Sequence, residues 1–340
     1  MAHYLEILLR KGNGRSRAAL SACSLAALAV IVLWSFPSIL VALNKMSNYL
    51  EYQFIQRALI VGTLVALCAA LLGVILVLKN YSMIGDGLSH VGFGALTVAV
   101  SLGTITADRL PAFLPEGVRA TLADVFSRIA LSPMLFTLGV VVICATLLLR
   151  ISKSSSLRGD SAIALISTSS LALGVIVTSM TSGMNIDVYN YMFGSILAMS
   201  NSDVYLSLGL SAVVLVMFLL FYHKIFAVTF DEVFARATGL NVGVYNLMIA
   251  MLTAVTIVVG MRMMGTMLIS SLIIFPALTS MRLFSRFSSV VISSAIVSVS
   301  CFATGIMLSC LYSMPAGAGI VAVNLAFFLV FSMIGALKMR

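Results

Sequence analysis

Long stretches without a charged residue run along the chain and predict helices that span a membrane. Asp, Glu, Lys and Arg are absent from nine stretches of 19 or more residues, namely 18–44, 58–78, 87–107, 129–149, 161–186, 204–222, 237–261, 263–281 and 287–337. About 20 apolar residues are needed to cross the hydrocarbon core of a bilayer as a helix. The last stretch is long enough for two helices and is interrupted by Ser313, Pro315, Gly317 and Gly319. The pattern therefore predicts an all-α, polytopic integral membrane protein with about ten transmembrane helices.

The composition supports a chain that is surrounded mainly by lipid. Of the 340 residues, 61% are hydrophobic and only 9% are charged, and the mean hydropathy is +1.15. Soluble domains carry roughly 25% charged residues. This difference excludes a soluble globular protein, a disordered chain and a small disulfide-built secreted module.

The basic residues are distributed unevenly between the two sides of the membrane that ten crossings define. If the N-terminus is cytoplasmic, fourteen of the 20 lie on the cytoplasmic side: Arg10, Lys11, Arg15, Arg17, Lys79, Arg150, Lys153, Arg158, Lys224, Arg236, Arg282, Arg286, Lys338 and Arg340. The other six, which lie outside, are Lys45, Arg57, Arg109, Arg119, Arg128 and Arg262. Because cytoplasmic loops are enriched in Lys and Arg, both termini are predicted to lie in the cytoplasm. The net charge of +9 is then a signal of topology and does not indicate binding to nucleic acid, which needs a clustered basic face.

The N-terminal segment, residues 1–45, combines a basic start with the first apolar stretch. A cleaved signal peptide has a shorter apolar region than the 27 residues of 18–44. We therefore predict a cytoplasmic basic segment followed by an extra, retained transmembrane helix. Residues 46–340 form the second predicted unit.

One polar string, residues 85–90, lies at the start of the stretch 87–107 and could bind a metal ion. Asp86 and His90 are four residues apart, so they share one helix face. A carboxylate oxygen and an imidazole nitrogen are suitable ligands for a divalent transition metal. A simpler alternative is that Asp86 caps the helix and His90 is an interior histidine. Because two ligands are few for a metal, the metal site would be completed by a second copy of the chain across a two-fold axis.

A second informative string, residues 229–239, connects two apolar stretches on the predicted cytoplasmic side. Thr229 and Glu232 have the spacing of a capping box, and Gly239 is placed to end the helix. This short helix could lie on the lipid surface, but its acidic start fits an anionic leaflet poorly, so we favour docking of a soluble partner. The candidate docking residues are Phe230, Asp231, Glu232, Phe234, Arg236 and Gly239.

Two further features concern a proline and an absent motif. Pro276 lies inside the stretch 263–281, where it removes a backbone hydrogen bond and is expected to kink the helix. Such kinks occur at transport sites and also where they only shape packing.

The chain has no G-x-x-x-x-G-K-[ST] sequence, so we do not expect it to bind ATP in a P-loop or to be an enzyme.

From about Gln53 onward, five strings in order resemble the permease subunits of bacterial ABC importers for zinc, manganese and iron, the ABC-3 family. They are residues 54–59 (FIQRAL), 83–90 (MIGDGLSH), 193–197 (FGSIL), 230–240 (FDEVFARATGL) and 265–277, which ends in Phe-Pro-Ala. The resemblance implies that 46–340 is a metal-transport permease domain, that Asp86 and His90 are the metal residues, and that 230–239 contacts an ATPase. Residues 1–45 have no counterpart in the family.

The resemblance also implies cofactors, partners and a location. The transported substrate would be a divalent metal ion (manganese, zinc or ferrous iron), with no permanently bound cofactor. The partners would be a second permease copy, as a homodimer or with a related permease, two ATPase subunits that use the ATP, and an extracytoplasmic metal-binding protein. The segments 108–128 and 187–203 are candidates for receiving that protein. The permease would lie in the bacterial cell (inner) membrane.

Two alternatives remain open at this point. A permease for chelated iron or a vitamin would share the architecture without needing Asp86 and His90. A secondary metal transporter would work without an ATPase partner, but is expected to show more intramembrane acids or interrupted helices in matching halves.

Overall fold

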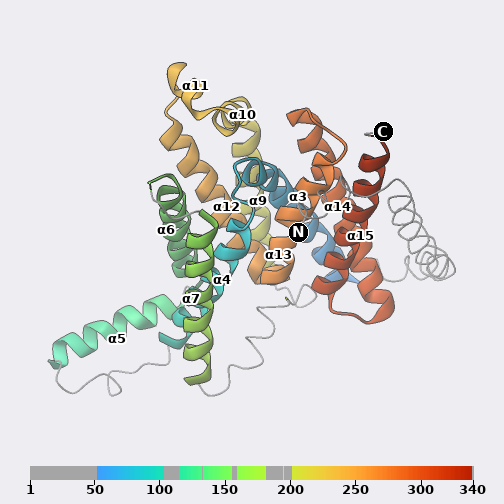
Figure 1. Ribbon diagram of the computed structural model, residues 1–340. Helices are drawn as coiled ribbons and strands as arrows, with labels where there is room; N and C mark the ends of the chain where they lie inside the picture. The colour runs from blue at the N-terminus through green and yellow to red at the C-terminus, as the bar shows by residue number, and fades with distance from the viewer. Residues whose placement is uncertain are drawn as a thin grey trace.

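The computed structural model of the protein describes residues 52–102, 115–131, 133–154, 159–180, 194 and 201–338. In those ranges the regular secondary structure is helical throughout (Figure 1). The helices are α3 (Gln53–Leu78), α4 (Ile84–Leu102), α5 (Glu116–Leu131), α6 (Pro133–Ser154), α7 (Gly159–Met180), α9 (Asn201–Leu220), α10 (Tyr222–Phe230), α11 (Glu232–Ala237), α12 (Val242–Met264), α13 (Thr266–Met281), α14 (Phe287–Tyr312) and α15 (Ala316–Lys338). The fold class predicted from the sequence is confirmed. The expected helix 18–44, the unit 1–45 and the connector 187–203 fall outside the described residues, except for Gly194 and 201–203.

Nine of the predicted crossings correspond to helices of the described residues, which are α3, α4, α6, α7, α9, α12, α13, α14 and α15. Among the described residues, five single helices are long and apolar enough to cross a bilayer, and up to seven spans result if two bent helix pairs each count as one. The predicted division of 287–337 is also confirmed. Helix α14 ends at Tyr312, Ser313 has a left-handed backbone with φ 52°, and α15 begins after Pro315.

A single residue, Gly265, separates α12 from α13, three residues beyond the predicted boundary at Arg262. Its backbone has φ 87° and ψ 161°, a combination that is essentially restricted to glycine. Arg262 instead lies in the last turn of α12, where a positive charge is favourable. The chain can therefore reverse within one residue and pack α13 against α12.

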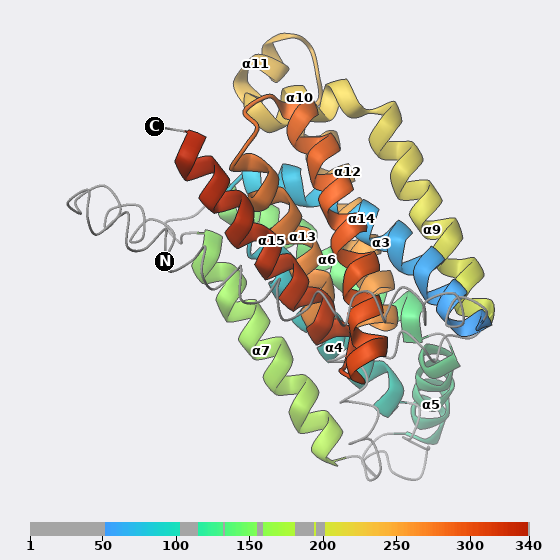
Figure 2. The ribbon, with the colours of Figure 1, turned by 90° about the vertical axis from the view of Figure 1, so that its right-hand side faces the viewer.

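Two helices were not predicted from the sequence. Helix α5 occupies part of the expected connection 108–128, and it begins with Glu116 and has Arg128 in its last turn, as the helix dipole favours. Helix α10 follows α9 directly and is bent from it by 70°. Both views show α10 and α11 at one end of the molecule and α5 at the opposite end (Figures 1 and 2).

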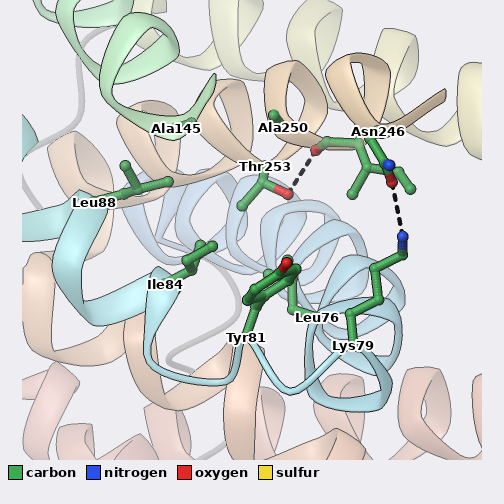
Figure 3. Close-up of a pocket in the computed structure, with 10 residues that line it drawn as sticks. Leu76, Lys79, Tyr81, Ile84, Leu88, Ala145, Asn246, Ala250 and Thr253 are labelled. Carbon is green, nitrogen blue, oxygen red and sulfur yellow. Dashed lines mark hydrogen bonds between the residues drawn. The ribbon is translucent and has the colours of Figure 1, made fainter. Parts of the chain in front are cut away.

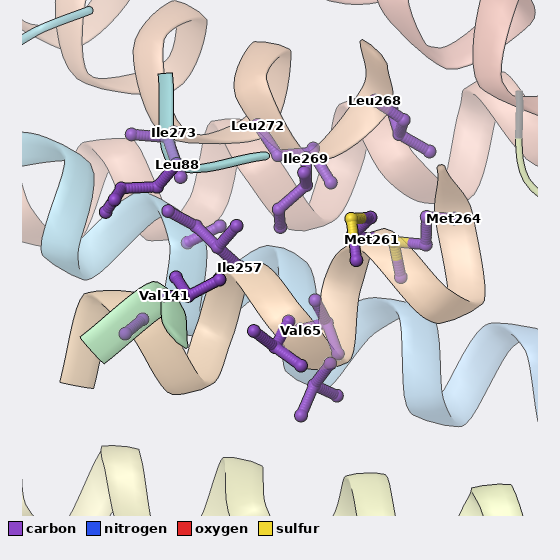
Figure 4. Packing of buried hydrophobic residues seen from close by; sticks show 14 of the residues in the cluster. Val65, Leu88, Val141, Ile257, Met261, Met264, Leu268, Ile269, Leu272 and Ile273 are labelled. Atoms are coloured by element: carbon purple, nitrogen blue, oxygen red, sulfur yellow. The ribbon is translucent and has the colours of Figure 1, made fainter. Parts of the chain in front are cut away.

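The centre of the bundle is formed where α3, α4, α12 and α13 pack together (Figure 4). Their apolar side chains interlock with Val141 of α6, and the labelled members are Val65, Leu88, Ile257, Met261, Met264, Leu268, Ile269, Leu272 and Ile273. Helices α14 and α15 pack on the α3–α13 side, and α6 and α7 pack on α4. Helix α4 is thereby held among α6, α7, α12 and α13, and α5 also contacts it.

Contacts at the two ends of the bundle agree with the predicted sorting of basic residues. Lys79 contacts Glu232 of α11, and Phe287, next to Arg286, packs on Phe226 of α10 with ring centroids 5.1 Å apart. Lys79 and Arg286, both predicted to be cytoplasmic, thus lie at the end of the bundle where α11 lies. Arg262, predicted to lie outside, contacts Met134 at the start of α6, far along the bundle from α11.

Glycines allow the central helices to approach closely. A Cβ atom on Gly73 of α3 would lie 2.0 Å from the backbone oxygen of Ile273 in α13, and one on Gly94 of α4 would lie 2.5 Å from that of Ser170 in α7. Backbone atoms cannot move aside as a flexible side chain can. Small residues therefore permit close helix packing, as they commonly do in membranes, at α3–α13 and α4–α7.

We predict that Gly73→Ala destabilises the protein by about 1–3 kcal/mol, because the added methyl group forces α3 away from α13. The measurement is the thermal unfolding midpoint of the purified protein in detergent. Gly139→Ala is the matched control, since Gly139 lies in α6 with no atom within 4 Å of an added Cβ. Equal midpoints for both variants would contradict the role given to Gly73.

Candidate functional site

The turn between α3 and α4 positions Asp86. Asn80, with φ 60°, ends α3 in a left-handed conformation. The amides of Asn80 and Tyr81 donate to the carbonyls of Val77 and Leu76 at 3.1 and 2.8 Å, which is the hydrogen-bond pattern of a Schellman motif. Helix α4 begins at residue 84, so Asp86 lies in its first turn.

The side chains of Asp86 and His90 face each other on α4. His90 Nε2 lies 3.7 Å from Asp86 Oδ1, and the two side chains are 22% and 45% exposed, respectively. Asp86 is the third residue of α4 and not its N-cap, and an acid in this first turn also interacts favourably with the helix dipole. Two ligand atoms held about 2.1 Å from one tetrahedral ion are about 3.4 Å apart. A small rotation of either side chain would therefore let both bind the same ion.

This pair is not completed by further ligands of the same chain in the described ranges. No group of three or more His, Cys, Asp or Glu side chains that could hold a metal occurs there. Beside the pair, Ser89 Oγ donates to the Asp86 carbonyl at 2.7 Å and lies 3.3 Å from Ser270 Oγ of α13. The serine contact fixes the first turn of α4 against α13.

Helix α11 is shorter than predicted and has a different cap. It covers Glu232–Ala237, and Asp231 is its N-cap, with Oδ1 accepting from the amides of Val233 and Phe234 at 2.9 Å. The predicted capping box of Thr229 and Glu232 is wrong. Thr229 belongs to α10, where its hydroxyl donates to the Ile225 carbonyl at 2.7 Å, and it lies two residues before the N-cap position of α11.

The C-terminal end of α11 follows the prediction. Gly239 has φ 84°, and the amides of Gly239 and Leu240 donate to the carbonyls of Arg236 and Ala235, both at 3.0 Å. This is again a Schellman motif, in which glycine adopts the left-handed conformation without strain.

Helix α11 presents an apolar surface at its end of the bundle. Val233 is 80% exposed and Phe234 62% exposed, whereas Ala235 is buried against Val228 and Val242. Phe230 lies outside α11, at the end of α10, and its ring packs on those of Phe226 and Phe287. Of the candidate docking residues, Phe234 and Arg236 thus project from α11 itself, and Phe230 from the helix before it.

Glu232 has a function that the sequence did not reveal. Its carboxylate accepts from Lys79 Nζ at 3.0 Å and from Asn246 Nδ2 at 3.1 Å. The only sequence signal was an amide, Asn246, which together with Asn241 lies inside the apolar stretch 237–261. Pairing across 153 residues cannot be derived from spacing along the chain.

Pro276 is buried within α13, which continues past it to Met281. The proline therefore does not end the helix. Its contribution to transport stays a prediction.

Among residues 193–197, the structure describes Gly194, whose added Cβ would lie 2.2 Å from the Met264 backbone at the α12–α13 turn.

Comparison with known proteins identifies relatives over most of the chain. The chain is 27% identical to the manganese transport system membrane protein MntC of Halalkalibacterium halodurans, over 81% of this chain and 85% of that protein. It is 26% identical to the high-affinity zinc uptake system membrane protein ZnuB of Haemophilus influenzae, over 83% and 97%. The solved structure of PsaBC from Streptococcus pneumoniae in complex with Fab is similar with a TM-score of 0.65 and 26% identity, covering 86% of this chain and 95% of that one. The ABC 3 transport family matches residues 51–335, and the chain belongs to this family.

Proposed function

We propose that this protein is the membrane permease subunit of an ABC importer that moves divalent transition metal ions into the cytoplasm. The observation that carries the proposal is the facing pair of Asp86 and His90 in the first turn of α4. Manganese and zinc systems among the relatives support the substrate class. No feature of the described residues favours a vitamin or chelate permease, or a transporter without an ATPase.

The metal pathway lies between two permease copies. One chain supplies a carboxylate and an imidazole, and no third ligand accompanies them among the described residues. A second copy across a two-fold axis would bring the set to two aspartates and two histidines, which matches the usual four ligands of a tetrahedral metal site. Partial exposure of both side chains supports a pathway on the surface of one copy. A transiently held ion can then be released on the other side.

Helix α11 docks a separate ATPase subunit, which binds and hydrolyses the ATP. The exposed Val233 and Phe234 resemble the apolar anchors that dominate protein interfaces. Two ATPase copies would serve two permease copies. ATP-driven movement of α11 would switch the pathway between outward and inward access.

The α11 end of the bundle faces the cytoplasm of a bacterial cell, and α5 lies on the outer side of the inner membrane. Contacts of Lys79 and Phe287 at the α11 end, and of Arg262 at the start of α6, support this orientation through the positive-inside rule. An extracytoplasmic metal-binding protein would then approach at the end where α5 lies (Figure 2).

Replacing either metal ligand is predicted to abolish most uptake. Asp86→Ala and His90→Ala should each lower the initial rate of manganese or zinc uptake at least about tenfold, since even outer-shell changes weaken metal sites 10–100-fold. The measurement is uptake of the radioactive ions by cells at matched permease levels. His223→Ala is the control, because His223 is exposed on α10 and packs on the Tyr222 ring. Wild-type uptake in both ligand variants would refute the proposed pathway.

Removing the main aromatic anchor of α11 is predicted to weaken ATPase binding. Phe234→Ser should reduce the amount of ATPase that copurifies with the permease about tenfold or more, as expected for a hot-spot side chain. Tyr205→Ala is the matched control, because Tyr205 is an exposed aromatic residue in the first turns of α9, away from α10. Full retention of the ATPase by Phe234→Ser would show that α11 is not the docking element.

A further inference from the structure

The ammonium group of Lys79 lies between two helices that are distant in sequence. Lys79 follows the last residue of α3, and its Nζ donates to Asn246 Oδ1 at 2.7 Å (Figure 3). The same Nζ donates to Glu232 Oε1 at 3.0 Å. Its side chain is only 8% exposed. An ammonium group so far from water needs charged and polar partners. The three helix segments are therefore held at fixed distances around it.

Asn246 closes the arrangement into a triangle. Its amide oxygen accepts from Lys79, and its amide nitrogen donates to Glu232 Oε1 at 3.1 Å. The second carboxylate oxygen, Oε2, lies 4.0 Å from the Arg236 guanidinium on the same helix. Each member thus contacts the other two, and loss of one member removes a hydrogen bond from each of the others. We call these three residues the Lys79–Glu232–Asn246 triangle.

The triangle connects the two parts of the proposed machinery. Glu232 is the first residue of α11, and Lys79 precedes Asp86 by seven residues. The link between them is short and stiff, because residues 76–81 form the Schellman turn that ends α3. A displacement of α11 therefore reaches the first turn of α4 through a charged contact and one rigid turn.

A small cavity borders the same link. The cavity is lined by Lys79, Tyr81, Ile84 and Leu88 from the link and α4, and by Asn246 and Ala250 from α12 (Figure 3). Close-packed interiors transmit strain and resist displacement. At this junction the side chains of the link border a small void instead of only close-packed neighbours.

We propose that Lys79, Glu232 and Asn246 are positioning residues that couple movement of the ATPase-docking helix α11 to the start of α4, where the metal ligands lie. The inference rests on the proposed function, and it goes beyond that function by naming the contact that transmits the movement. Breaking the triangle should leave docking and metal binding in place and uncouple ATP hydrolysis from transport.

The test compares metal transported with ATP hydrolysed in the complete importer. The permease, its ATPase and its metal-binding protein are reconstituted in liposomes, and uptake of Mn²⁺ or Zn²⁺ is measured together with phosphate release. Lys79→Met keeps the apolar stem and removes the charge. We expect an assembled complex that still hydrolyses ATP, while metal transported per ATP falls about tenfold, within the usual range of coupling energies.

Lys224→Met is the matched control. Lys224 lies at the same end of the bundle on α10, where its Nζ is 5.7 Å from the Phe221 ring centroid and 5.8 Å from that of Tyr245. We expect its ratio of metal to ATP to equal that of the wild type. An assembled Lys79→Met complex with the wild-type ratio would overturn the proposal.

If Lys79→Met does not assemble with the ATPase, a charge reversal of Lys79 and Glu232 tests the proposed coupling instead. The double variant Lys79→Glu with Glu232→Lys restores an ion pair that Asn246 can bridge, because an amide both donates and accepts. We expect the double variant, but not Lys79→Glu alone, to recover assembly and most of the metal transported per ATP. Failure of the double variant to recover either would overturn the proposal.

Failure of this inference is distinguishable from failure of the proposed function. If only the triangle is misassigned, Lys79→Met couples normally while Asp86→Ala still loses uptake and Phe234→Ser still loses the ATPase. If the proposed function is wrong, the last two variants behave as wild type, whatever Lys79→Met does.

Discussion

An ionised side chain at the centre of a bilayer costs ~2.5 kcal/mol or more, and the distribution of charge in this protein follows from that cost. Charged residues make up 9% of the chain, and those that the structure describes lie at helix ends or in partnered clusters. Asp86 is in the first turn of α4, and Arg262 is in the last turn of α12. Lys79 donates hydrogen bonds to Glu232 of α11 and to Asn246 of α12. The charged groups named here therefore mark helix ends and polar contacts between helices.

Close helix packing is the second requirement, since lipid supplies no hydrophobic force between helices. Gly73 and Gly94 bring α3 against α13 and α4 against α7 at backbone contact. Helix α4 is thereby enclosed by its neighbours while Asp86 and His90 remain partly exposed. The proposed metal residues thus lie on a firmly held helix, as a selective site requires.

Lys79 connects the Asp86–His90 pair with helix α11. Asp86 and α11 are far apart in sequence, yet Lys79 lies seven residues before Asp86 and contacts Glu232 of α11. If the protein is driven by a separate ATPase, as proposed, it needs such a connection between its proposed docking surface and its proposed pathway. The Schellman turns at residues 76–81 and 235–240 stiffen both sides of that connection.

Local patterns in the sequence were sufficient for the membrane spans, for the facing of Asp86 and His90 four residues apart, and for the helix stop at Gly239. Each depends on hydrophobic run length or helical spacing, which neighbours in the chain determine. Tertiary structure alone decided that Glu232 pairs with Lys79 and Asn246 instead of with Thr229, because Asp231 provides the cap and a partner 153 residues away provides the charge. It also decided that α12 turns at Gly265 and not at Arg262, since a reversal within one residue needs a backbone conformation open only to glycine.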